Sequence, residues 1–155
     1  LLTYLYSIQE VLKGLGVKCV KLRVHPSENS EWYKKNIDNS FYSLDSIHLH
    51  DTLQTSSLVI GPISTVFFDT LRAGKNYIMY EPLVKHRTVK NFRLVQPFNG
   101  VDPRIPVANS EEELKYLISN KVVVSDGVLN DYAGSSFKME EFERIINFKD
   151  FEKIR

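Results

Sequence analysis

SLVIGPISTVFFDTLRAGKNYIMYEP, residues 57–82, is the stretch that decides the expected fold. Residues 58–60 form a short apolar run that is typical of a buried parallel strand. A Gly-Pro turn follows, and residues 66–74 predict a short helix that ends at a glycine. Residues 77–80 predict the next strand, which Glu81-Pro82 ends. A strand, a helix and a second strand in this order indicate a parallel α/β unit.

The segment upstream predicts a second unit of the same kind. In VKCVKLRV, residues 17–24, apolar and basic residues alternate, which indicates a strand with one face partly exposed to water. His25-Pro26 ends this strand. Residues 27–37 predict a short helix with a cap near Asn29. Residues 46–50 predict another short strand.

The chain opens on a helical pattern. Five apolar residues recur at spacings of three and four, which marks the buried stripe of a helix: Leu1, Leu5, Ile8, Leu12 and Leu15. Residues 14–16 end the helix. Neither an initiator Met nor a capping residue precedes the stripe. We therefore expect a fragment that begins within a helix and whose N-terminal partner domain is missing.

The second half of the chain predicts one more strand and two helices. Residues 92–98 suggest a strand near the sheet edge, and Ser110 to Glu113 form a capping box ahead of a helix. Phe142, Ile145 and Ile146 predict a C-terminal helix. Alternating strands and helices over residues 1–155 predict a single α/β domain with three Rossmann-like layers and a mainly parallel sheet.

Composition excludes several classes of protein. Of 155 residues, 43% are hydrophobic and 25% are charged, as in an ordinary globular protein, and the net charge of +1 argues against nucleic-acid binding. Cys19 is the only cysteine, so an internal disulfide and a multi-cysteine metal site are excluded. A lone thiol fits a cytoplasmic setting. No apolar run reaches the length of about 20 residues that spans a bilayer.

Two strand ends carry the candidate binding groups. His25 places an imidazole at the end of one strand, and Gly61 to Thr65 place a turn and two hydroxyls at a helix start. A helix start offers unpaired N–H groups and a partial positive charge, so Ser64 as cap and Thr65 beside it could bind phosphate oxygens. His25 could add a third donor. The sequence contains neither a P-loop nor a Gly-x-Gly-x-x-Gly motif.

Each of these features also has a purely structural interpretation. A serine at a helix start is commonly only a cap, and a His-Pro pair after a strand is weak by itself. The basic residues 85–87 could grip a phosphate, but charged residues in a loop are more often solvated surface. His48 and His50 have a spacing that could suit a metal, but no carboxylate or cysteine motif completes a site. We therefore predict no metal.

The two motifs in combination point to a known group of enzymes. KLRVHPSEN, residues 21–29, and residues 57–82 resemble the paired His-Pro and Ser-Ser/Ser-Thr motifs of bacterial sialyltransferases and polysialyltransferases. They look equally like segments of CDP-glycerol glycerophosphotransferases and, more distantly, of UDP-N-acetylglucosamine 2-epimerases. The resemblance covers about residues 17 to 82. All these families have two facing Rossmann-like domains, the GT-B arrangement, and hold the nucleotide mainly in the C-terminal one.

The resemblance implies a role for each matching residue. His25, with Pro26, would contact the nucleotide phosphate and support the charge of the departing nucleotide. Gly61, Ser64 and Thr65 would bind that phosphate from the turn. Glu81 would accept hydrogen bonds from the ribose hydroxyls. No cofactor is implied, because the nucleotide-activated donor, linked to CMP, CDP or UDP, is the substrate.

The implied protein is the donor-binding half of a glycosyltransferase that builds bacterial surface polysaccharide. Its partner would be its own N-terminal domain, in the cytoplasm, and peripheral association of the full-length protein with the inner face of the membrane is compatible with this function. The acidic motif that carries the base in sialyltransferases is absent here. The catalytic base is therefore absent from this fragment, or the mechanism differs. A sugar-nucleotide epimerase domain and a non-catalytic interaction domain stay open as alternatives.

Overall fold

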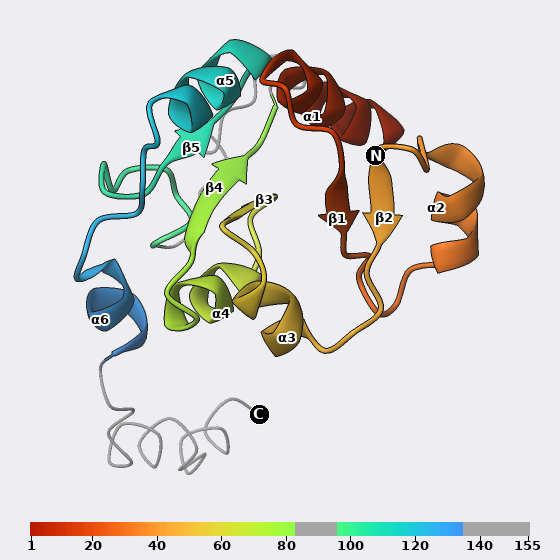
Figure 1. The fold of residues 1–155 in the computed structure, drawn as a ribbon. Helices are drawn as coiled ribbons and strands as arrows, with labels where there is room; N and C mark the ends of the chain where they lie inside the picture. Colours follow the sequence, from red (N-terminus) through yellow and green to blue (C-terminus); the bar gives the residue numbers. More distant parts are fainter. Residues whose placement is uncertain (83–95, 135–155) are drawn as a thin grey trace, which may run out of the picture.

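The computed structural model describes residues 1–82 and 96–134 (Figure 1). The elements, in chain order, are α1 (Leu2–Gly14), β1 (Val20–Leu22), α2 (Ser30–Asn36), β2 (Tyr42–Leu44), α3 (Leu49–Gln54), β3 (Leu58–Gly61), α4 (Val66–Arg72), β4 (Asn76–Tyr80), β5 (Val107–Ala108), α5 (Glu111–Ser119) and α6 (Val128–Ala133). None of the helices in this part of the chain is long and apolar enough to cross a membrane.

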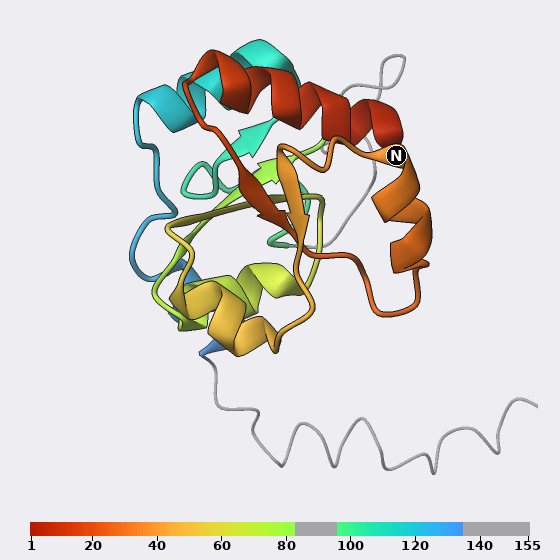
Figure 2. The ribbon, with the colours of Figure 1, turned by 45° about the vertical axis from the view of Figure 1, so that its right-hand side comes forward.

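The strands form two short parallel sheets. β1 pairs with β2, and β4 lies between β3 and β5. In Figure 2 the arrows of β4 and β5 both point up and to the right, whereas the arrow of β1 points down. The predicted mixed α/β fold with parallel strands is confirmed. The predicted single sheet is not, because the hydrogen-bond ladder is divided between β1–β2 and β3–β4–β5 in the described residues.

Strand β4 is the centre of the packing. Ile78 and Tyr80 belong to a cluster with side chains of α1, α2 and α5, whereas Tyr77 and Met79 belong to a second cluster with side chains of α4 and α6. All four side chains are at most 1% exposed. Burying a side chain of this size contributes roughly 1.5–3 kcal/mol. Alternate residues of β4 are therefore buried on opposite faces of the strand. This packing holds β4 in place and so positions the residues that follow it.

Four predicted helices are confirmed, α1, α2, α4 and α5, and the predicted caps of α2 and α5 are present. Leu5, Ile8 and Leu12 of α1 are buried, although Leu1 is 62% exposed. The side chain of Asn29 caps α2 by accepting the N–H groups of Glu31 and Trp32. At α5, the Ser110 hydroxyl accepts the N–H of Glu113 at 3.2 Å. The Glu113 carboxylate reaches back one residue further than a capping box requires and accepts the N–H of Asn109 at 2.7 Å.

The predicted strand at residues 46–50 is wrong. The strand lies earlier, at β2, because Phe41 and Tyr42 enter the core and are 1% and 4% exposed. Residue 49 instead begins α3, in which Thr52 and Leu53 are buried.

Three further predictions fall wholly or partly on residues outside the described part. Residues 96–98, the end of the strand predicted at 92–98, form turns. Residues 92–95, the basic loop at 85–87 and the C-terminal helix at 142–146 lie outside the described residues.

Candidate functional site

The turn after β3 is shaped by a tyrosine beneath it. A Cβ atom added at Gly61 would lie 2.5 Å from the Tyr77 hydroxyl oxygen. That hydroxyl donates a hydrogen bond to the carbonyl of Pro62 at 2.6 Å. Only glycine leaves room for this bond, so packing against Tyr77 is sufficient to explain Gly61.

Glu81 joins this turn from the neighbouring strand. The register pairs Gly61 with Met79, so Glu81 lies just beyond the end of β3. Its Oε1 accepts the backbone N–H of Ile63 at 2.7 Å. Its own N–H donates to the carbonyl of Ala108 at 2.8 Å, which ties its backbone to β5. The structure therefore brings Glu81 together with the turn at the carboxyl ends of two adjacent strands.

Ser64 and Thr65 lie where the turn enters α4. The Ser64 hydroxyl accepts the N–H of Val66 at 3.3 Å. The N-cap position itself is Thr65, one residue later than predicted, and its side chain makes no capping bond. Such one-residue differences are usual at helix ends. α4 has only seven residues, so hydroxyl and N–H donors in the turn matter more here than a long helix dipole.

His25 and Pro26 lie on a separate exposed loop after β1. Nδ1 of His25 is 2.7 Å from the Ser27 hydroxyl oxygen and accepts the Ser27 N–H at 3.2 Å. β1 and β3 belong to different ladders. Within residues 1–82 and 96–134, no hydrogen bond or ion pair joins His25 to the turn at Ser64. The structure thus groups Gly61, Ser64, Thr65 and Glu81, whereas neither a hydrogen bond nor a shared strand ladder joins His25 and Pro26 to that group in the described residues.

Two tyrosines border the site without any sequence signal. Burial raises the pKa of the Tyr77 phenol, and the charge of Glu81 adds to the effect. Burial also raises the pKa of Tyr4, with further contributions from Tyr77 and Glu81. The Tyr4 hydroxyl is enclosed and has no hydrogen-bond partner among the described residues. Both phenols are therefore neutral and feel the charge of Glu81, whereas the sequence pattern placed Tyr77 only in a predicted strand.

Possible metal ligands do not gather in the described part of the chain. Over residues 1–82 and 96–134, no group of three or more His, Cys, Asp or Glu side chains could hold a metal ion. His48 precedes α3 as its N-cap residue, and His50 lies within that helix. The two histidines therefore do not share the strand face on which their spacing was interpreted.

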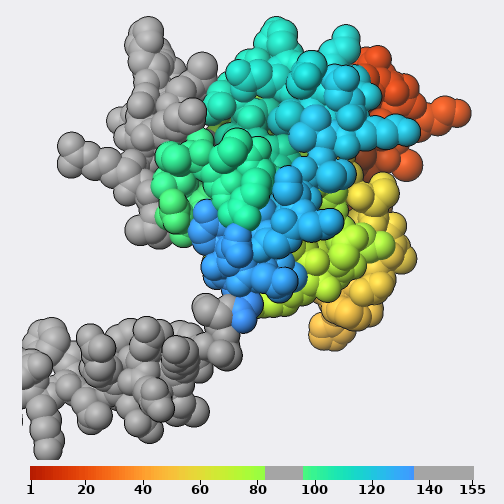
Figure 3. Space-filling view, turned by 90° about the vertical axis from the view of Figure 1, so that its left-hand side faces the viewer, coloured from red at the N-terminus to blue at the C-terminus, as the bar shows by residue number. Residues whose placement is uncertain are grey.

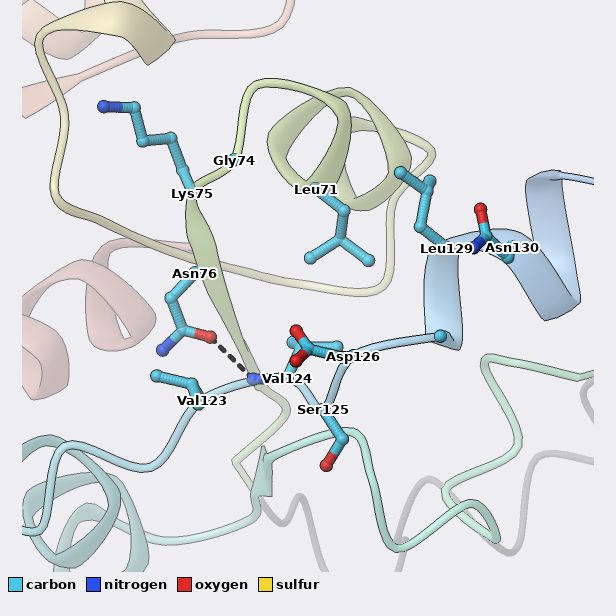
Figure 4. A pocket seen from close by; sticks show the side chains of 11 residues that line it. Leu71, Gly74, Lys75, Asn76, Val123, Val124, Ser125, Asp126, Leu129 and Asn130 are labelled. Carbon is cyan, nitrogen blue, oxygen red and sulfur yellow. Dashed lines mark hydrogen bonds between the residues drawn. The ribbon is translucent and has the colours of Figure 1, made fainter.

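A pocket of about 460 Å³ opens at the other end of β4 (Figure 4). Asn76 connects two segments that line this pocket. Its side chain donates a hydrogen bond to the carbonyl of Val122 at 2.8 Å and accepts one from the N–H of Val124 at 2.9 Å. α6 borders it, and α6 contacts α4 on the face shown in Figure 3. Because Asn76 begins β4 and Glu81 follows its end, this pocket is not part of the candidate site.

The site combines hydroxyl and N–H donors with one carboxylate acceptor. Donors of this kind suit phosphate oxygens, and a carboxylate suits hydroxyl groups of a sugar. Comparison with known proteins found no matching protein-family model, no matching curated protein and no matching solved structure.

Proposed function

We propose that this chain is the donor-binding domain of a glycosyltransferase of bacterial surface polysaccharide synthesis, a three-layer Rossmann-like domain that forms half of a GT-B arrangement. The observation that supports it best is the bond between Glu81 and Ile63 at 2.7 Å, which joins a donor-bearing turn and a carboxylate at adjacent strand ends. In open parallel α/β sheets, ligands bind beyond the carboxyl ends of the strands.

The contacts of Glu81 support a particular arrangement of the nucleotide in this proposal. Oε1 of Glu81 already takes the Ile63 N–H, and its negative charge repels a phosphate at that position. The phosphate therefore binds further along the turn, at the hydroxyls of Ser64 and Thr65. The ribose hydroxyls donate to the Glu81 carboxylate, as the resemblance implies.

His25 completes the proposal as the group that stabilises the departing nucleotide. Its side chain is exposed, so it can donate to a phosphate oxygen that approaches from solvent. Stabilising charge that develops on the leaving group is a major source of rate acceleration. The acceptor-activating base is then contributed from outside this chain, by the partner domain.

Isothermal titration calorimetry with CMP, CDP and UDP tests this proposal. We expect saturable binding of at least one nucleotide and a preference among the bases. The 2′,3′-dideoxy form of the preferred nucleotide isolates the ribose contact: it should bind more weakly than the parent to the wild type, and the difference should shrink in Glu81→Gln. Absence of binding for all three nucleotides would leave a non-catalytic α/β domain, the alternative stated above.

A further inference from the structure

The loop after β1 determines which nitrogen of His25 carries a proton. The backbone N–H of Ser27 donates to Nδ1 of His25 at 3.2 Å. A backbone amide can only donate, so Nδ1 must present a lone pair at this contact. In a neutral imidazole the proton then sits on Nε2.

A second group on the same residue supports this arrangement. The Ser27 hydroxyl oxygen lies 2.7 Å from the same Nδ1. A hydroxyl can donate or accept, and here it donates, because the neighbouring amide already requires a lone pair on Nδ1. Both donors of Ser27 therefore converge on one ring nitrogen.

Glu28 stabilises the same loop through further hydrogen bonds. Its N–H donates to the carbonyl of His25 at 2.9 Å, which closes a turn. Its Oε2 accepts the N–H of His25 at 3.3 Å and the hydroxyl of Tyr33 at 2.9 Å. Tyr33 is only 4% exposed. An exposed imidazole is thus attached to a loop that is anchored on a buried side chain of α2.

We infer that Ser27 is a positioning residue that holds His25 in the Nε2–H tautomer, so that the imidazole offers a single N–H donor to an anionic oxygen. In this tautomer the lone pair of Nε2 belongs to the aromatic π system, so Nε2 donates its N–H and does not accept a proton. His25 therefore acts on its ligand by hydrogen-bond donation and not as a base. The identity of the ligand, a nucleotide phosphate, rests on the proposed function, whereas the tautomer does not.

Nitrogen-15 NMR of the histidine side chains reads the tautomer directly. At about pH 8, where an unperturbed imidazole is neutral, the wild type should show His25 with an unprotonated Nδ1 and a protonated Nε2. His25→Gln assigns the resonance. Ser27→Ala should add a detectable share of the Nδ1–H tautomer, and Ser27→Thr, which keeps the hydroxyl, should restore the wild-type spectrum. An Nδ1–H tautomer in the wild type would overturn the inference, and identical spectra for wild type and Ser27→Ala would contradict a role of the Ser27 hydroxyl and leave the backbone N–H as the group that holds the tautomer.

Titration with CMP and with inorganic phosphate separates the two proposals. Ser27→Ala should weaken CMP binding about five-fold, roughly the contribution of one hydrogen bond, and Ser27→Thr should bind like the wild type. Ser30→Ala, a serine in the first turn of α2, is the matched control and should change nothing. The wild type could show the inferred tautomer while the His25 resonances do not change on addition of either anion. This result would contradict the nucleotide site and leave the positioning by Ser27 intact. Full CMP affinity in Ser27→Ala would contradict the positioning role.

Discussion

The carboxylate of Glu81 accepts the backbone N–H of Ile63 at 2.7 Å and so joins the end of β4 to the turn that follows β3. Hydrogen bonds from an N–H group to an ionised carboxylate are roughly twice as strong as neutral ones. The backbone of Glu81 is itself held by β5. The geometry of the turn therefore depends on a side chain 18 residues away in the sequence.

Removal of the Glu81 side chain should destabilise the protein. Glu81→Ala leaves the Ile63 N–H without its charged partner, so we expect the free energy of unfolding to fall by about 1.5–3 kcal/mol. Glu81→Gln keeps an acceptor oxygen and should lose about 1 kcal/mol. Urea denaturation followed by circular dichroism measures both values. Unchanged stability of Glu81→Ala would show that the turn does not depend on this bond.

Gly61→Ala should destabilise the protein through overpacking. The new Cβ would lie 2.5 Å from the Tyr77 hydroxyl oxygen, and Tyr77 is 1% exposed and cannot move away freely. Inserting a carbon into a packed core costs typically 1–3 kcal/mol. The midpoint of urea denaturation reports this cost.

Tyr77→Phe provides the matched control for Gly61→Ala. Alone it removes the bond to Pro62 and should cost about 1 kcal/mol. Combined with Gly61→Ala it removes the closest clashing atom and leaves the next one at 3.3 Å. The double variant should therefore be more stable than the sum of the two single effects predicts. Strict additivity would show that the glycine is needed for another reason, such as approach of a ligand.

The elements that the sequence predicted correctly are those with strong local signals. Asn29 and Ser110 cap their helices as their side chains favour, and the apolar residues 77–80 form a strand that is buried on both faces. The strand predicted at 46–50 failed because alternation over five residues is a weak signal. Burial of Phe41 and Tyr42 in the tertiary core decided its position instead.

The candidate site was predictable only in part. Ser64 and Glu81 each follow an apolar strand, so their position at strand ends could be inferred. Their common location depends on the register between β3 and β4, which no local pattern sets. The contact of Tyr77 with Gly61 depends on the same register.

The stability of the loop before β5 should depend on pH. The hydrogen bonds from the Arg104 side chain hold the pKa of Asp102 well below its usual range, with a further bond from Tyr132. Below about pH 4, near the reference value for aspartate, the unfolded chain binds a proton that the folded carboxylate does not. The stabilisation by Asp102 is therefore complete above about pH 4 and is lost as the pH falls toward the lowered pKa.

Asp102→Asn tests this dependence. The variant should be less stable than the wild type at neutral pH. The difference in stability between the two proteins should become smaller below about pH 4. Asp126→Asn, which replaces an exposed aspartate, is the control and should follow the wild type at every pH. Thermal denaturation at several pH values measures this difference in stability. A difference that stays constant down to acidic pH would contradict the role of the Asp102 charge.

Ser64 and His25 should respond differently to replacement by alanine, because only one of them supports the fold. Ser64→Ala loses the bond to the Val66 N–H and should reduce stability by about 0.5–1.5 kcal/mol, the contribution of one hydrogen bond. It should weaken nucleotide binding by only about 1 kcal/mol, since the N–H donors of the turn remain.

His25→Ala replaces an exposed side chain and should change stability by less than about 0.5 kcal/mol. Loss of the proposed hydrogen bond to a charged phosphate should weaken nucleotide binding by roughly 1.5–3 kcal/mol. Calorimetric titration of CMP and UDP into the wild type and both variants, beside urea denaturation of each, gives the two quantities. Equal nucleotide affinities in all three proteins would contradict a role of Ser64 and His25 in nucleotide binding. Ser64 would then be only a residue at the start of a helix, and His25 only a residue at the end of a strand.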